Sequence, residues 1–162
     1  RMLCTFDIDG WTLVFTICED IWHAGPAAQL QKAGTDLILN LNASPYRINK
    51  ADERFDQVQA RCRETGLPVL YCNLVGGQDE LVFDGASFVC DSQGNRCVQA
   101  ASFTEALVPV DVQCQGGHCE PRGEVLPLPG PQAGMYQALV LATRDYVNKN
   151  GFKGALWDCP GG

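Results

Sequence analysis

The amino-acid sequence predicts a layered α/β domain with a mixed β-sheet. In the first half of the chain, short apolar runs alternate with segments of helical periodicity, which is typical of β-α-β units. Asp9-Gly10 and Asp84-Gly85 each lie between two strand-like runs, and Asp-Gly favours tight hairpin turns. Hairpin-like strands follow the alternating part, so we expect antiparallel as well as parallel strands in the sheet.

Four elements are expected in the N-terminal part. Leu3–Ile8 and Thr12–Ile17 are predicted to be the two strands of a hairpin. Pro26–Ala33 is predicted to be a short helix, because proline suits the first turn of a helix and a glycine follows the last one. Asp36–Asn42 is predicted to be a strand buried on both faces, because its apolar residues form a nearly continuous run.

A longer helix is expected next. Its apolar residues recur at intervals of three and four and form one stripe: Ile48, Ala51, Phe55, Val58 and Cys62. Asn49 can cap the start of this helix, and Gly66 with Pro68 can end it.

Short strands are expected after the helix. The first is Pro68–Val75, and Gly76–Glu80 is interpreted as a polar turn that follows it. Further strands are predicted at Leu81–Phe83, Ser87–Asp91, Arg96–Ala100 and Glu105–Gln113.

The segment Cys114–Gln132 interrupts this pattern. It contains four glycines and four prolines in 19 residues and has no periodicity, which is typical of a linker. A helix that ends at Asn150-Gly151 and a strand at Phe152–Trp157 are predicted after it. We therefore divide the chain into a first domain at residues 1–114, a linker at 115–132 and the start of a second domain at 133–162.

Composition excludes several classes of protein. The 162 residues are 46% hydrophobic, which is sufficient for a core and excludes a wholly disordered chain. The 12 Lys and Arg residues against 19 Asp and Glu give a net charge of −7, which argues against nucleic-acid binding. No apolar run approaches the roughly 18 residues of a membrane-spanning helix, so we expect no membrane partner and a cytoplasmic location.

Nine cysteines are many for this length. Their number is odd, their spacing is irregular and no Cys-x-x-Cys pair occurs, so neither a disulfide framework nor a zinc site is expected. We interpret most of them as buried thiols of a cytosolic protein.

Cys18 is the sharpest candidate for chemistry. It lies where the apolar strand Leu13–Ile17 gives way to a tight turn and a helix, which would expose the thiol beside backbone N–H groups that can stabilise an oxyanion. The alternative is a buried thiol at a strand end. His23 could act as its base, or could be an ordinary solvated or core histidine.

Ser44 and Lys50 are candidates for substrate binding. Ser44 follows the strand Asp36–Asn42, and such strand ends line the ligand crevice of open α/β sheets. Lys50 opens the next helix and could hold a substrate carboxylate. The alternatives are a turn hydroxyl and a solvated lysine. Gly161-Gly162 could begin a phosphate-binding loop or be a flexible end.

Several specific residue runs resemble one family. They occur in the order of that family and cover nearly the whole chain: Ile17–Trp22, Asn42–Tyr46, Val75–Gly85, Tyr136–Leu141, Arg144–Val147 and Lys149–Phe152. These runs are similar to the glutamine-dependent NAD⁺ synthetases, whose glutaminase domain belongs to the nitrilase, or carbon-nitrogen hydrolase, superfamily.

This resemblance implies a nitrilase-like αββα sandwich that is incomplete at its N-terminus. Residues 1–114 would be the C-terminal part of the carbon-nitrogen hydrolase (glutaminase) domain. Residues 115–132 would be the linker, and residues 133–162 would be the truncated start of a synthetase domain of the adenine-nucleotide α-hydrolase type.

The resemblance also implies a reaction. Cys18 matches the nucleophile that attacks the side-chain amide of glutamine, which gives a thioester and ammonia and then glutamate. Glu19 and Ser44 match positions that contact glutamine, and Lys50 matches a basic residue near its carboxylate. In the family the ammonia amidates nicotinic acid adenine dinucleotide to NAD⁺ with ATP and Mg²⁺, whereas the glutaminase step needs no cofactor. A homo-oligomer is expected.

The chain departs from the family pattern at two places. The family's catalytic Glu and Lys precede the cysteine, and residues 1–17 contain neither, so we expect this chain by itself to be inactive. Pro160-Gly161-Gly162 stands where the family has Ser-Gly-Gly, so no ATP or Mg²⁺ ligand is assigned. The alternative functions are another nitrilase-superfamily amidase and a non-catalytic piece that acts only in packing or assembly.

Overall fold

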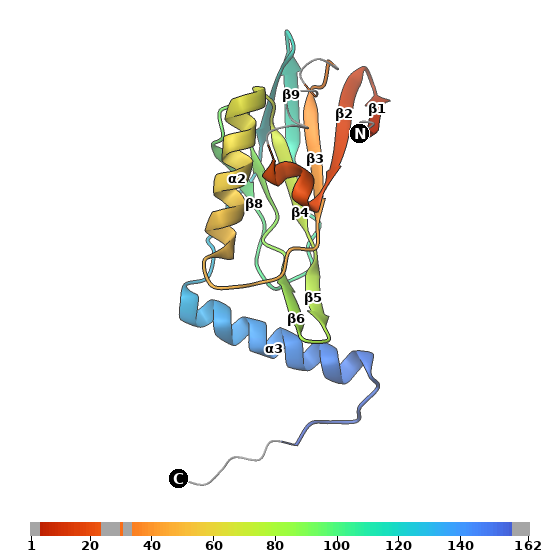
Figure 1. Cartoon of the computed structure of the whole chain (residues 1–162), viewed down its shortest axis with the longest axis vertical. Helices are drawn as coiled ribbons and strands as arrows, with labels where there is room; N and C mark the ends of the chain where they lie inside the picture. The colour runs from red at the N-terminus through yellow and green to blue at the C-terminus, as the bar shows by residue number, and fades with distance from the viewer. Residues whose placement is uncertain (1–3, 24–29, 31–33, 157–162) are drawn as a thin grey trace.

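The computed structural model describes residues 4–23, 30 and 34–156. Its main feature is a six-stranded sheet with the order β1-β2-β3-β4-β7-β8 (Figure 1). These strands are β1 (Cys4–Ile8), β2 (Trp11–Ile17), β3 (Leu37–Asn42), β4 (Val69–Asn73), β7 (Phe88–Cys90) and β8 (Arg96–Gln99). Strands β2, β3 and β4 are parallel, and the other pairs are antiparallel, which confirms the predicted α/β class with a mixed sheet.

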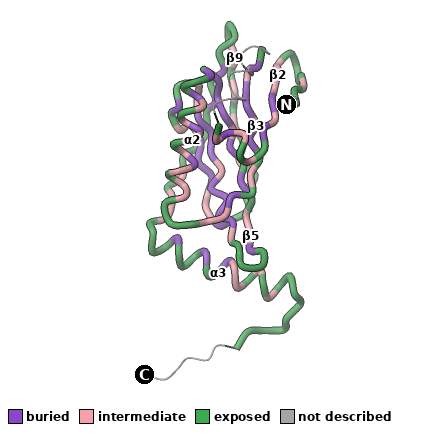
Figure 2. The backbone as a smooth tube through the Cα atoms, in the orientation of Figure 1, coloured by how far each residue is buried: buried purple, intermediate pink, exposed green. Residues whose placement is uncertain are grey.

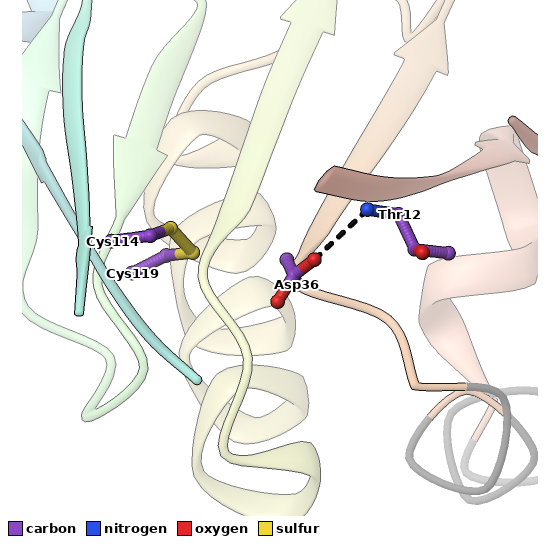
Figure 3. Close-up of a disulfide and its surroundings, with 4 residues drawn as sticks. All are labelled: Thr12, Asp36, Cys114 and Cys119. Atoms are coloured by element: carbon purple, nitrogen blue, oxygen red, sulfur yellow. Dashed lines mark hydrogen bonds between the residues drawn. A yellow bond between two sulfur atoms is a disulfide. The ribbon is translucent and has the colours of Figure 1, made fainter. Parts of the chain in front are cut away.

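Two hydrogen bonds next to the parallel β2–β3 ladder also hold the N-terminal hairpin against the start of β3. The backbone N–H of Thr12 donates to Asp36 Oδ2 at 2.9 Å, and the N–H of Asp36 donates to the carbonyl of Thr12 at 2.8 Å (Figure 3). These bonds fix the start of β3 against the start of β2. The predicted helix Pro26–Ala33 lies outside the described residues except for Leu30, which is buried.

Helix α2 (Lys50–Thr65) covers one face of the sheet, and the main core lies between the two layers (Figures 1 and 2). Side chains of both layers are fully buried there: Val14, Ile38, Val58, Cys62 and Val69. The helix ends as predicted, because Gly66 adopts a φ of 68° and donates its N–H to the carbonyl of Cys62. Asn49 precedes the helix in a left-handed conformation, and its side chain makes no capping bond.

The opposite face of the sheet is covered less completely. Leu41 of β3 is 45% exposed, so the prediction of a strand buried on both faces is wrong for this end of it. The segment from Ala101 to Val110 passes over this face and leaves a cavity of about 640 Å³ that is lined mainly by apolar side chains. Among the described residues, the cover of this face is a loop. No strand forms over residues 105–110, so the predicted strand Glu105–Gln113 is also wrong there.

Two further hairpins lie outside the main sheet. Strands β5 (Val75–Gln78) and β6 (Leu81–Asp84) form the first one, so most of the segment interpreted as a turn is strand. Strands β9 (Asp111–Gln115) and β10 (His118–Arg122) form the second one, which extends from the end of the expected first domain into the expected linker. The Gly116-Gly117 pair is a local sequence signal for this second hairpin. In the structure both glycines have the positive φ that a two-residue hairpin turn of this kind requires.

A disulfide joins Cys114 and Cys119 across β9 and β10 (Figure 3). The two residues are direct partners in the antiparallel register, with Cα atoms 4.1 Å apart. The expectation of buried thiols without a disulfide is therefore wrong for this pair. Among the other described cysteines, Cys62 and Cys90 are buried as expected, whereas Cys4 and Cys72 are exposed.

Helix α3 (Pro131–Lys149) forms where a helix was predicted and packs against the β5–β6 hairpin (Figure 1). Two hydrogen bonds join it to Gly77: the N–H of Gly77 donates to Asp145 Oδ2 at 2.7 Å, and Lys149 Nζ donates to the carbonyl of Gly77 at 2.6 Å. Much of α3 is exposed (Figure 2). Residues 152–156 form no strand, which corrects the predicted strand in its described part.

In the described part of the chain, no helix combines the length and the apolar character that a membrane span requires.

We predict that Gly77→Ala weakens the attachment of α3. An added Cβ at Gly77 would lie 3.1 Å from Ala142 Cα and 3.3 Å from Asp145 Cβ, so the helix must shift. Overpacking of this kind costs about 1–3 kcal/mol. The free energy of unfolding and the protease sensitivity of α3 measure the effect. Gly130→Ala is the control, because nothing lies within 4 Å of its Cβ position. Equal behaviour of the two variants would contradict the prediction.

Candidate active site

The carboxyl ends of three parallel strands form the edge on which the candidate site lies. Thr16, Asn40 and Tyr71 are paired across β2, β3 and β4. Successive residues of a strand alternate between the two faces, so the positions two residues later return to the same face at the strand ends. The residues at those positions are Cys18, Asn42 and Asn73. The strand ends therefore bring two carboxamides to this edge of the sheet, and Cys18 directly follows β2 at the same edge.

Cys18 occupies a strained turn. It directly follows β2, opens the 3₁₀ helix η1 (Cys18–Trp22) and has a φ of 47°, which costs a residue other than glycine about 1–3 kcal/mol. The backbone N–H of Ile17 donates to Asp20 Oδ2 at 3.1 Å and closes this turn. The thiol is half-buried, which differs from the alternative of a fully buried thiol at a strand end. A reactive side chain on a strained strand-to-helix turn is typical of nucleophiles in α/β hydrolytic enzymes.

Ser44 is held rigidly beside the strand ends. It is 9% exposed, and its N–H donates to Asn73 Oδ1 at 2.9 Å. Its carbonyl accepts hydrogen bonds from Asn73 Nδ2 at 3.3 Å and Arg54 Nη2 at 2.7 Å. Its hydroxyl oxygen accepts one from Arg54 Nε at 3.1 Å. Ser44 is therefore more constrained than the alternative of an ordinary turn hydroxyl implies.

Arg54 and Asp84 form a buried ion pair behind Ser44. Arg54 Nη1 donates to Asp84 Oδ1 at 2.8 Å and Oδ2 at 3.0 Å, and the two side chains are 1% and 4% exposed. The sequence interpretation missed both residues. A signal for Arg54 was present, because it lies three residues after Ala51 and four before Val58, on the apolar stripe of α2.

Lys50 lies at the first turn of α2, against η1. Its Nζ is 4.4 Å from the centre of the Trp22 ring and 2.8 Å from Glu53 Oε2. The hydrogen bond from Lys50 is the main cause that lowers the pKa of Glu53, and Arg47 contributes as well. The Lys50 side chain is 15% exposed, so it is not the freely solvated lysine of the alternative interpretation.

The phenol of Tyr71 is buried below Ser44. The residue is 2% exposed, and its hydroxyl has no hydrogen-bond partner among the described residues. Burial raises the pKa of Tyr71 to about 12, and the charge of Arg54 opposes this rise.

Glu19 and His23 are less well placed for a role in this candidate site than Cys18, Ser44 and Lys50. Glu19 follows Cys18 directly, and its side chain is exposed. His23 is exposed beyond the far end of η1, which places it about 10 Å along the helix axis from Cys18 at the rise of a 3₁₀ helix. The geometry therefore does not favour His23 as the base of Cys18.

Neither a metal site nor the candidate phosphate-binding loop can be added to this site from the described residues. Within the described residues, no group of three His, Cys, Asp or Glu side chains could hold a metal ion. Gly161-Gly162 lies outside the described residues.

A family model matches most of the chain. The carbon-nitrogen hydrolase model matches residues 3–117, which include the six-stranded sheet, η1 and α2.

Curated relatives match almost the full chain. A glutamine-dependent NAD⁺ synthetase of Rhodobacter capsulatus is 43% identical over 148 residues, which are 90% of this chain and 27% of the relative. One from Acinetobacter baylyi is 36% identical over 159 residues, which are 97% of this chain and 29% of the relative. The resemblance to this group of proteins is confirmed. The chain spans between a quarter and a third of the length of these relatives.

Solved structures agree with the fold. The glutamine-dependent NAD⁺ synthetase of Acinetobacter baumannii, solved with ADP, superposes with a TM-score of 0.87 at 37% identity and covers 96% of this chain and 29% of that one. An amidase of the nitrilase superfamily from Nesterenkonia gives a TM-score of 0.56 at 22% identity over 62% of this chain and 38% of its own. The amidase supports the nitrilase-like fold alone.

We predict that Arg54→Met strongly destabilises the protein. The substitution leaves the Asp84 carboxylate buried without its partner, which costs about 3–5 kcal/mol. Chemical denaturation measures the loss. Arg122→Met is the matched control, because its ion pair with Glu120 is exposed and contributes about 0–1 kcal/mol. A loss below 1 kcal/mol for Arg54→Met would contradict the structural role of the pair.

Proposed function

Because the chain belongs to the carbon-nitrogen hydrolase family, we propose that Cys18 is the nucleophile of an amide-hydrolysing site whose substrate is glutamine. The observation that carries this proposal is the strained turn that holds the half-buried Cys18 thiol at the carboxyl edge of the parallel strands. The similarity to glutamine-dependent NAD⁺ synthetases supports glutamine as the substrate.

The reaction proceeds in two halves. The Cys18 sulfur attacks the carbonyl carbon of the side-chain amide, and the tetrahedral intermediate then loses its amine, which takes a proton and leaves as ammonia. Water adds to the resulting thioester, the C–S bond breaks and glutamate leaves. A free thiol has a pKa of ~8.5, so it is mostly protonated near neutral pH. The first half of the reaction therefore needs a base that removes this proton. Residues 1–17 contain no Glu, Lys or His that could be this base.

Three other residues would bind glutamine. Lys50 would attract the substrate carboxylate, in competition with Glu53, which is 2.8 Å from Lys50 Nζ. Ser44 would present a hydroxyl whose position is fixed by Arg54. Glu19 would contact the substrate from the residue next to the nucleophile.

The activity of the whole protein is a wider proposal. Ammonia would pass to a synthetase domain that begins near residue 133 and amidates nicotinic acid adenine dinucleotide to NAD⁺ with ATP and Mg²⁺ in a homo-oligomeric enzyme. Among the described residues, this part consists of α3 and a short segment after it, which offer no cluster of metal ligands. We therefore derive no step through ATP or Mg²⁺.

We predict that a glutamine-analogue electrophile labels Cys18 selectively. The full-length protein is treated with 6-diazo-5-oxo-norleucine, and the labelled peptide is located by mass spectrometry. Cys18→Ala should abolish labelling, whereas Cys72→Ala, which removes an exposed thiol, should not change it. Labelling at another cysteine would refute the assignment of the nucleophile.

We also predict that the 162-residue chain alone releases little or no ammonia from glutamine, because residues 1–17 contain neither the Glu nor the Lys that the family places before the cysteine. An ammonia assay that compares it with the full-length protein tests this. Turnover by the chain alone that is lost in Cys18→Ala would contradict the expectation. Hydrolysis of simple aliphatic amides in preference to glutamine would indicate another amidase of the superfamily.

Lys50 and Glu53 should have opposite effects on glutamine binding. Loss of a charge-assisted hydrogen bond in Lys50→Met should raise KM about 10- to 100-fold and change kcat less. Glu53→Gln should lower KM, because it frees Lys50 from its carboxylate partner. Steady-state kinetics of the full-length protein separate the two effects. An unchanged KM in Lys50→Met would exclude the carboxylate contact.

A further inference from the structure

Helix α3 contains a glycine that lets it approach the ring of Tyr46. Gly134 lies near the start of the helix, is buried and donates its N–H to the carbonyl of Gly130 at 2.8 Å. Glycine is among the least favourable residues within a helix, so its presence there calls for a local reason. A Cβ at Gly134 would lie 2.9 Å from the hydroxyl oxygen of Tyr46 and 3.8 Å from its Cζ. The missing side chain of Gly134 therefore makes room for the Tyr46 hydroxyl.

The ring of Tyr46 is held from the side of α3. It packs against the buried cluster of Phe103, Ala138 and Leu141, two of which belong to α3. Its contact with the Phe103 ring is edge-to-face, with the ring centres 5.2 Å apart. A cavity of about 150 Å³ borders Tyr46 between the starts of α2 and α3. The ring therefore has room to move wherever α3 does not hold it.

The backbone of Tyr46 is joined to the residues that fix Ser44. Its N–H donates to the carbonyl of Val82 in β6 at 2.7 Å. The carbonyl of Pro45, which belongs to the same planar peptide group, accepts a hydrogen bond from Arg54 Nη2 at 3.0 Å. Arg54 Nε in turn donates to the hydroxyl oxygen of Ser44 at 3.1 Å. A displaced Tyr46 therefore draws this peptide group away from Arg54 and moves Ser44, which precedes Pro45 directly.

We propose that Tyr46 is a positioning residue for glutamine, and that Gly134 of α3 holds it in place. The inference rests on the proposed function, in which Ser44 binds glutamine and Cys18 attacks it. The contact between Tyr46 and α3 fixes the peptide group next to Ser44, so the seating of α3 sets the affinity for glutamine. Helix α3 thus completes the substrate-binding segment, although it follows the linker in the sequence. Because Tyr46 acts through Ser44, its displacement weakens binding and leaves the thiol reactive.

The test begins with a single methyl group at Gly134 in the full-length protein. Gly134→Ala places this group against the Tyr46 hydroxyl and should raise KM for glutamine at least about fivefold, with a smaller change in kcat. Glutamate release measures both constants. Gly130→Ala is the matched control on the same helix and should keep the parental KM, because nothing lies within 4 Å of its Cβ position. The rate at which iodoacetamide alkylates Cys18 should be the same in all variants, which reports a folded site.

A second substitution separates this steric effect from a general effect of alanine in α3. Tyr46→Phe removes the hydroxyl that the new methyl group meets, and the next ring atom, Cζ, lies at an ordinary contact distance of 3.8 Å. In the Tyr46→Phe background, Gly134→Ala should therefore change KM by no more than about twofold. Tyr46→Ala, which removes the whole ring, should raise KM as Gly134→Ala does, and it serves as the alternative if Gly134→Ala does not fold.

Two results would overturn the inference. One is an unchanged KM in folded Gly134→Ala or, where that variant does not fold, in Tyr46→Ala. The other is a rise in KM from Gly134→Ala that persists in the Tyr46→Phe background. Failure of 6-diazo-5-oxo-norleucine to label Cys18 in the parent protein would instead overturn the proposed function, and this inference with it.

Discussion

The buried ion pair between Arg54 and Asp84 is the interaction on which the site depends. Two charges removed from water are stabilised only if their hydrogen bonds are well satisfied. The guanidinium of Arg54 must therefore keep its hydrogen-bond geometry, and this fixes the elements whose atoms it binds. Arg54 comes from α2 and Asp84 from β6, and the remaining donors of Arg54 bind Ser44 and the carbonyl of Pro45. One arginine therefore sets the distance between the helix, the hairpin and the segment after β3.

The rest of the site follows from the position of α2. Its first turn carries Lys50, and the contact of Lys50 with Trp22 joins it to η1, whose first residue is Cys18. Along the strands, the buried face changes from apolar to polar toward the same edge: Val14 and Ile38 belong to the core, whereas Thr16, Asn40 and Asn42 form a hydrogen-bonded network. The face of the sheet under α2 is thus apolar toward one end and polar toward the end at which the candidate site lies.

Local sequence patterns predicted those elements and residues whose positions depend mainly on the neighbouring sequence. The apolar stripe and Gly66 located α2, and the end of an apolar strand located Cys18. Arg54 and Asn42 were not predicted, because a charged or amide side chain is normally assigned to the surface and only tertiary contacts explain its burial. Likewise Gly76 and Gly77 suggested a turn, whereas the structure uses Gly77 in a strand so that α3 can approach its backbone. The Gly116-Gly117 turn is assigned to a linker because glycines and prolines are frequent around it, although Val112, Cys114 and Cys119 alternate with polar residues on its two sides.

The backbone at residue 18 implies a conflict between folding and chemistry. Positive φ angles also occur at Asp9, Asn49 and Asp79, which are residue types that tolerate this conformation, and at Ala86 and Phe103, which are not such types. Cysteine does not belong to these types, so a glycine at position 18 would relieve strain and favour the folded state. Selection for thermal robustness alone would therefore remove the thiol, and under the proposed role of Cys18 its presence there exchanges stability for reactivity.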